Sequence, residues 1–110
     1  MKINNQGLDL IKRWEGFEMR AYLCPAGVPT IGYGATYYPN NRNAVKLTDR
    51  PISESYASLL LEDMVIHYER GVDRYVRVEL TSNQFSALVS FAYNVGLGAL
   101  KSSTLLKRVN

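Results

Sequence analysis

The hydrophobic pattern at the start of the chain predicts a short amphipathic helix. Its apolar side chains recur every three positions and share one helical face: Leu8, Ile11 and Trp14. Asn4 or Asn5 can cap the helix with a side-chain oxygen, and Gly16 is a typical stop signal just past its end. We therefore expect a helix over residues 4–14 that leaves Glu15 at its C-terminal end.

Residues 18–38 lack this helical spacing and predict a small antiparallel β-sheet. Residues 22–23 and 30–33 are expected to be its strands, since both contain the aromatic and β-branched side chains that favour a pleated surface. Between them, residues 25–27 (Pro-Ala-Gly) have the chemistry of a tight turn. The polar residues 39–50 that follow predict a loop, with a further short strand as an alternative.

The middle of the chain predicts one long helix that ends near residue 75. Pro51 and Ser53 supply the residues typical of a helix start. The apolar stripe expected along this helix consists of Tyr56, Leu59, Leu60, Met64, Tyr68 and Val72.

Two more helices are expected towards the end of the chain. Thr81 and Gln84 have the spacing of a capping box, and Gly96 is a stop signal. The apolar positions between them are Phe85, Leu88, Val89, Ala92 and Val95. The last helix is expected to begin near Ser102 or Ser103 and to run to the end of the sequence.

The composition is that of a globular protein and excludes several classes. With 110 residues, of which 46% are hydrophobic, we expect a single α+β domain over residues 1–110. The net charge of +3 suits an anionic partner, but the cations are scattered, which argues against a nucleic-acid patch. One cysteine and one histidine form neither a disulfide nor a zinc site, so we expect no metal and no cofactor. The start of the chain has no unbroken apolar run, so neither a signal peptide nor membrane insertion is expected.

Glu15 is the first candidate for chemistry. A carboxylate at a helix C-terminus meets the negative end of the helix dipole, and the flanking aromatic residues Trp14 and Phe17 would remove water from it. Both effects raise the pKa of a carboxyl group, which suits a general acid. The alternative is an exposed glutamate near Arg13 or Arg20 with an ordinary pKa.

Cys24 and Thr30 are each ambiguous when taken alone. Cys24 stands at a strand end before a turn, where functional residues are common, but an isolated cysteine is often a small buried apolar residue. The only histidine, His67, lies far away in the long helix, so a cysteine protease is not expected. Thr30 can simply be a β-branched residue in a strand.

The three positions together resemble a known signature. The spacing resembles the Glu–(eight)–Asp/Cys–(five)–Thr pattern of the phage-type lysozymes, the endolysins of glycoside hydrolase family 24. In this chain eight residues separate Glu15 from Cys24, and five residues separate Cys24 from Thr30. The segments WEGF and AYLCPAGVPTIGYG around these residues resemble the same family, as does LTSNQFSALVSFAYNVGLGALKSSTLL over residues 80–106. The resemblance covers nearly the whole chain.

This resemblance implies a lysozyme-like α+β fold and a muramidase that cuts the β-1,4 bond between N-acetylmuramic acid and N-acetylglucosamine in peptidoglycan. Glu15 would protonate the glycosidic oxygen, while Cys24 stands where many members carry Asp. Thr30 would help to place the water or would line the cleft beside it. Cys24 would act either as a thiolate, with its pKa lowered by a cation such as Arg20, or as a neutral thiol that only polarises the water. Inversion and retention both remain open.

The sequence departs from the family pattern at two places. Family members usually read Gly-His-Thr where this chain has Ala35, so Asp63, our match for the acidic partner of that histidine, would lack it. We expect a stability cost of a few kcal/mol for a partly buried pair and less if Asp63 faces water. Family members also continue for several dozen residues, so the apolar faces of residues 85–95 and 103–109 are expected to be under-covered. A homodimer, a swapped helix or a partner would cover them.

These departures support a second hypothesis, an inactive or weakly active relative that binds or structures the cell wall. In both cases the expected partner is the peptidoglycan glycan strand. With no signal peptide expected, the protein would be made in the host cytoplasm and reach the wall after release by a separate pore-forming protein. The expected biological role is host lysis and phage release.

Overall fold

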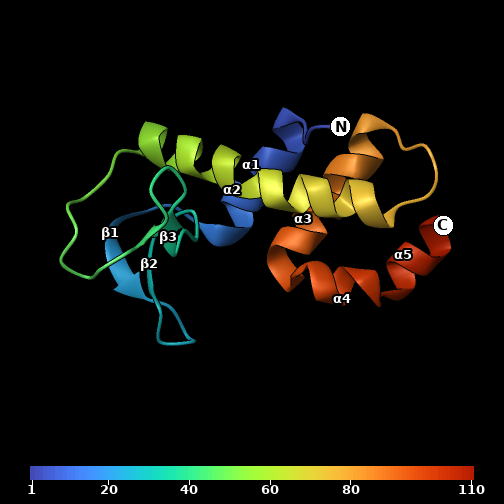
Figure 1. The fold of residues 1–110 in the computed structure, drawn as a ribbon. Coiled ribbons are helices and arrows are strands. Elements are labelled where there is room, and N and C mark those ends of the chain that lie inside the picture. Colours follow the sequence, from blue (N-terminus) through green and yellow to red (C-terminus); the bar gives the residue numbers. More distant parts are fainter. The chain divides into compact units, whose positions relative to one another are not determined.

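The computed structural model describes the whole chain except the side chains of residues 104 and 105. The chain forms two compact units, which we call the sheet unit (residues 12–64) and the helical unit (residues 1–11 and 65–110). In chain order the elements are α1 (Asn5–Glu15), β1 (Glu18–Leu23), β2 (Pro29–Gly32), β3 (Tyr37–Tyr38), β4 (Asn43–Ala44), α2 (Glu54–Tyr75), α3 (Ser82–Val95), α4 (Leu97–Lys101) and α5 (Thr104–Val109) (Figure 1). The boundaries between the units fall within α1 and α2.

α1 begins and ends as its sequence predicts. The Asn4 side chain accepts a hydrogen bond from the Gly7 N–H at 2.9 Å, which is the bond of an N-cap. Gly16 follows the last residue, Glu15, with a φ of 71°, a left-handed conformation that glycine adopts at little cost. Of the predicted apolar face, Ile11 is buried, but Trp14 is 75% exposed. The expectation that Trp14 packs inward is therefore wrong.

The sheet unit is built on an antiparallel hairpin of β1 and β2 (Figure 1). Its register pairs Tyr22 with Thr30 and Leu23 with Pro29, which confirms the predicted sheet, although β1 begins earlier than expected. The strand alternative for residues 39–50 is also confirmed, because β4 lies there and pairs with β3.

The long helix α2 buries part of the predicted stripe: Leu60, Met64 and Val72 are buried as expected. Tyr56 and Leu59 are instead 39% and 59% exposed, and the small Ala57 is buried beside them. A Cβ atom added at Gly32 of β2 would lie 3.2 Å from the Ala57 Cβ, so the sheet approaches α2 where only small side chains fit. Close backbone approach, rather than hydrophobicity alone, therefore selects the buried face. The cap is as predicted, since the Tyr56 N–H donates to the Ser53 hydroxyl at 3.1 Å.

The helical unit confirms the predicted capping box. The Gln84 N–H donates to the Thr81 hydroxyl, and the Thr81 N–H donates to the Gln84 side chain, at 3.1 Å and 2.9 Å. Gly96 ends α3 as expected, but the short helix α4 that follows was not predicted. The last helix is preceded by Ser103, which caps it by accepting the Leu106 N–H.

The start of the chain is tied to the helical unit by polar contacts. The Ile3 N–H donates to the buried Glu69 carboxylate at 2.6 Å, and the Asn4 N–H donates to the Ser86 hydroxyl at 2.8 Å. Gly7 packs closely here, because an added Cβ would lie 2.8 Å from the Ser86 Cβ. Ionic and neutral hydrogen bonds of this kind fix the beginning of α1.

The apolar face of α3 is covered, contrary to expectation. The side chains predicted to line it are buried, with the exception of Val95, which is 43% exposed: Phe85, Leu88, Val89 and Ala92. Leu106 of α5 is buried as well. The apolar face of α3 is thus covered within the protein; the side chains of residues 104 and 105 lie outside the described part of the chain, and a homodimer or a covering partner stays a prediction.

Ala35, which stands where family members usually have histidine, is expected to cause the smaller of the two losses of stability considered above. Ala35 is fully buried and fills the site without a polar atom, and Asp63 is exposed to water. A solvated carboxylate needs no partner. Among the described residues, no helix is both long enough and apolar enough to cross a membrane.

Candidate active site

Glu15 is the last residue of α1 and lies shortly before β1, in the sheet unit. Its side chain is half-buried, and this loss of water raises the pKa of the carboxyl group above its ordinary value. The predicted direction is thus confirmed. The exposed Trp14 does not supply the burial, and the neighbouring Phe17 packs on the Tyr33 ring at 5.7 Å between centroids.

Cys24 lies at the end of β1, in the loop that closes the hairpin. The Gly27 N–H donates to the Cys24 carbonyl at 2.8 Å, and the Cys24 N–H donates to the Val28 carbonyl at 3.1 Å. Gly27 has a φ of 79°, so the loop is a tight turn followed by a left-handed glycine. This common three-residue connection follows directly from Pro25 at the second turn position and glycine at the fourth.

The loop turns backbone N–H groups towards the Cys24 sulfur. Hydrogen bonds from the Val28 N–H and then the Ala26 N–H lower the pKa of the thiol, although partial burial opposes them. The expectation that a cation such as Arg20 would do this is wrong, because the donors are backbone amides. The lowered pKa increases the share of thiolate at a given pH, and the choice between the two states that the sequence left open stays a prediction.

Thr30 is brought next to Cys24 by the strand pairing. Its side chain is buried, and its hydroxyl donates a hydrogen bond to the Val28 carbonyl at 2.9 Å. The same hydroxyl also reaches the Cys24 sulfur, and it contributes to the lowered pKa of the thiol when it donates its one hydrogen there instead of to the Val28 carbonyl. A hydroxyl has one hydrogen and two lone pairs, so Thr30 can also accept a hydrogen bond from a water.

Tyr22 lies close enough to the candidate residues to interact with them electrostatically, and the sequence reasoning did not single it out. Burial first, and then the negative charge of Glu15, raise the pKa of its hydroxyl; Glu18 and Cys24 add to the effect. The Tyr22 hydroxyl therefore lies within electrostatic range of both Glu15 and Cys24. The signal was present in the sequence, since residues two apart on a strand share a face and Tyr22 precedes Cys24 by two.

The electrostatics of the site move its two ionisable groups in opposite directions. The pKa of Glu15 is raised by burial, and that of Cys24 is lowered by amide hydrogen bonds. Both shifts raise the fraction of molecules that carry a protonated Glu15 carboxyl together with a Cys24 thiolate, which is the combination that an acid and a base need. Among the described residues, no three His, Cys, Asp or Glu side chains converge as metal ligands.

Comparison with known proteins places this geometry in a family. Residues 12–110 match the profile of the family described as "Phage lysozyme". The chain is 47% identical to an endolysin of Bacillus phage B103, covering 100% of this chain and 40% of that protein. It is 36% identical to an endolysin of Salmonella phage P22, covering 100% of this chain and 74% of that protein.

Solved structures show the same fold. An endolysin from Escherichia coli O157:H7 phage FAHEc1 superimposes with a TM-score of 0.90 at 39% identity, over 98% of this chain and 66% of that one. The muramidase domain of SpmX from Asticaccaulis excentricus does so with a TM-score of 0.84 at 37% identity, over 99% of this chain and 69% of that one. The fold is therefore lysozyme-like, as the resemblance implied, and the chain belongs to the phage lysozyme family.

Proposed function

We propose that this chain is a muramidase that hydrolyses the β-1,4 bond between N-acetylmuramic acid and N-acetylglucosamine in peptidoglycan. Family membership supports this, as do relatives described as endolysins and a muramidase domain. The chain spans about 40% of the length of the endolysin of Bacillus phage B103. The role that follows is lysis of the host cell wall, which the protein reaches after release from the cytoplasm.

In the proposed reaction, Glu15 donates its proton to the glycosidic oxygen as the bond to the anomeric carbon breaks. A water held between the Cys24 sulfur and the Thr30 hydroxyl attacks that carbon. One proton of this water passes to the thiolate. After the bond is cut, Glu15 is therefore a carboxylate and Cys24 a neutral thiol. Tyr22 lies within range of both charges and is proposed to position the water or the sugar.

The observation that carries this proposal is the match of residues 12–110 to the phage lysozyme family, a range that contains Glu15, Cys24 and Thr30. The directions of the two pKa shifts agree with it: a raised carboxyl pKa helps Glu15 to keep the proton that the leaving group needs, and a lowered thiol pKa makes the anion that the water needs more available. The function therefore rests on Glu15 and Cys24 acting together.

The test is clearing of a suspension of outer-membrane-stripped Gram-negative cells, followed by turbidity. Glu15→Gln keeps the shape of the side chain but cannot donate a proton, so activity should fall by about 100- to 10,000-fold. Glu62→Gln removes an exposed carboxylate on α2 that has no part in the candidate site, and it should clear nearly as fast as the parent.

Equal clearing by Glu15→Gln and the parent would remove Glu15 from the mechanism. A parent that binds the wall but does not clear the cells would support the non-catalytic alternative. Circular dichroism of each variant confirms that the folded state is retained.

A further inference from the structure

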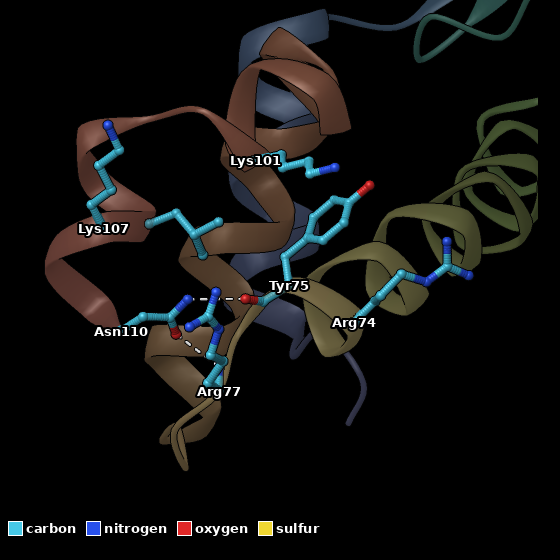
Figure 2. A pocket seen from close by; sticks show the side chains of 7 residues that line it. Arg74, Tyr75, Arg77, Lys101, Lys107 and Asn110 are labelled. Carbon is cyan, nitrogen blue, oxygen red and sulfur yellow. Dashed lines mark hydrogen bonds between the residues drawn. The ribbon is translucent and has the colours of Figure 1, made fainter.

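A cavity of about 540 Å³ in the helical unit is lined by cationic side chains (Figure 2). It lies away from Glu15 in the sequence and is formed by the end of α2, the following loop, α4 and α5. The residues that matter here are Arg74, Tyr75, Arg77, Lys101, Lys107 and Asn110. None of the residues lining it is acidic.

Two hydrogen bonds connect residues that line this basic cavity. The Asn110 amide donates to the Tyr75 carbonyl at 3.0 Å and accepts the Arg77 N–H at 2.7 Å, and Figure 2 shows both bonds. One side chain thus ties α5 to the chain where α2 ends. Lys101 lies over the Tyr75 ring, with its Nζ 5.8 Å from the ring centroid. This cation–π contact orients the lysine at the rim.

The cations of the cavity outnumber the negative charges of its lining residues, because four cationic side chains share the lining with only the α-carboxylate of Asn110 in the 110-residue chain. Among the described residues, none of its cations, Arg74, Arg77, Lys101 and Lys107, is within ion-pair distance of a carboxylate. Four like charges around one cavity repel each other and create a positive potential. An anion bound there would relieve the repulsion.

We propose that the basic cavity binds the phosphodiester groups of a polyanionic cell-envelope polymer of the poly(glycerol phosphate) type. Phosphate oxygens match both the planar N–H groups of arginine and the point charge of lysine. The cations come from separate elements and surround a space larger than one phosphate, which favours a chain of phosphates over a single ion. The proposal rests on the proposed function, because a wall hydrolase meets such polymers at its substrate in those bacteria whose walls carry them.

The experiment measures binding of poly(glycerol phosphate) to the 110-residue chain by isothermal titration calorimetry at several salt concentrations. The double variant Lys101→Gln/Lys107→Gln removes two charges from the cavity. Arg70→Gln/Arg108→Gln removes the same charge from exposed positions on α2 and α5 outside it. We expect binding about tenfold weaker for the first variant and less than twofold weaker for the second. The slope of log affinity against log salt should fall by about 1.4 for the first alone.

Equal weakening by both double variants would overturn the proposal, since it would reduce the effect to net charge. Tighter binding of a single-stranded oligonucleotide of matched charge would overturn it in favour of nucleic acid. Clearing of phosphate-polymer-free peptidoglycan separates the two proposals. If the parent cuts this peptidoglycan but does not bind poly(glycerol phosphate), only the cavity proposal is overturned. If it binds poly(glycerol phosphate) but does not cut the peptidoglycan, only the muramidase proposal is overturned.

Discussion

Replacing Cys24 by aspartate should change the pH dependence of hydrolysis in a defined way. The active form carries a proton on Glu15 and none on Cys24. For a carboxyl and a thiol with ordinary pKa values of 4.5 and 9.0, only about 3 in 100,000 molecules have this arrangement, and the fraction is constant between those values. The observed shifts bring the two values closer, and each unit of approach raises the fraction about tenfold.

The parent should therefore show a broad plateau that ends, on the alkaline side, near the pKa of Cys24. In Cys24→Asp the anion has an ordinary pKa of about 3.9, below that of Glu15. The alkaline limb then reports the raised pKa of Glu15 instead, so the optimum becomes narrow and moves towards acid. Near pH 4, about 40% of the molecules of this variant would have the active arrangement if Glu15 titrated at its ordinary 4.5.

The assay is kcat/KM against pH, with release of soluble fragments from dye-labelled peptidoglycan. Cys24→Ser is the control, because its hydroxyl cannot ionise in this range, and its activity should fall by about 100-fold or more. An alkaline limb at the same pH in the parent and in Cys24→Asp would show that Cys24 is not the titrating group. Circular dichroism across the pH range excludes unfolding as the cause of either limb.

The other predictions concern stability and the surface beside Glu15. Glu69→Ala removes the buried acceptor of the Ile3 N–H, so the free energy of unfolding measured in urea should fall by about 2 kcal/mol. The control Glu62→Ala changes an exposed residue and should alter that free energy little. An equal loss of stability in both variants would contradict the prediction. Thr81→Ala breaks the capping box at a cost of about 1 kcal/mol, so calorimetry should show a Tm about 4 °C lower, and an unchanged Tm would refute the cap. Trp14, the only tryptophan, is 75% exposed, so its emission in Glu15→Gln should shift to shorter wavelength when peptidoglycan fragments bind. An unchanged spectrum in a binding-competent sample would place the glycan elsewhere.

Local backbone chemistry was readable from the sequence. The turn at residues 25–27, the stop at Gly16 and the capping box at Thr81 depend on a few neighbouring residues, so each appears in the structure where the sequence predicts it. α4 was missed because a helix of this length has too few positions to show a period.

The buried faces were harder to predict, because they depend on what packs against them. The stripe proposed for α2 included Tyr56 and Leu59, which are exposed, because Gly32 of β2 comes close at Ala57 instead. Trp14 likewise fits a helical period but faces water. Apolar residues outnumber the positions on one face, and the spacing alone does not choose among them.

The candidate site was located by sequence, but its electrostatics were not. Spacing and resemblance singled out Glu15, Cys24 and Thr30, and their catalytic roles stay predictions. The lowered pKa of Cys24 comes chiefly from the backbone N–H groups of Val28 and Ala26, which any residue type can supply. The residue types do not show where such backbone donors will point, so the sequence analysis predicted a charged side chain instead.

The hairpin loop that holds Cys24 has a consequence beyond acid–base chemistry. Peroxides and alkylating agents react with thiolates far faster than with thiols, and the same amide groups that favour the anion also favour this attack. Oxidation to a sulfenic acid would place an oxygen atom where the water should sit. Aspartate at this position would be immune, so relatives with cysteine would carry a sensitivity to oxidants that relatives with aspartate lack.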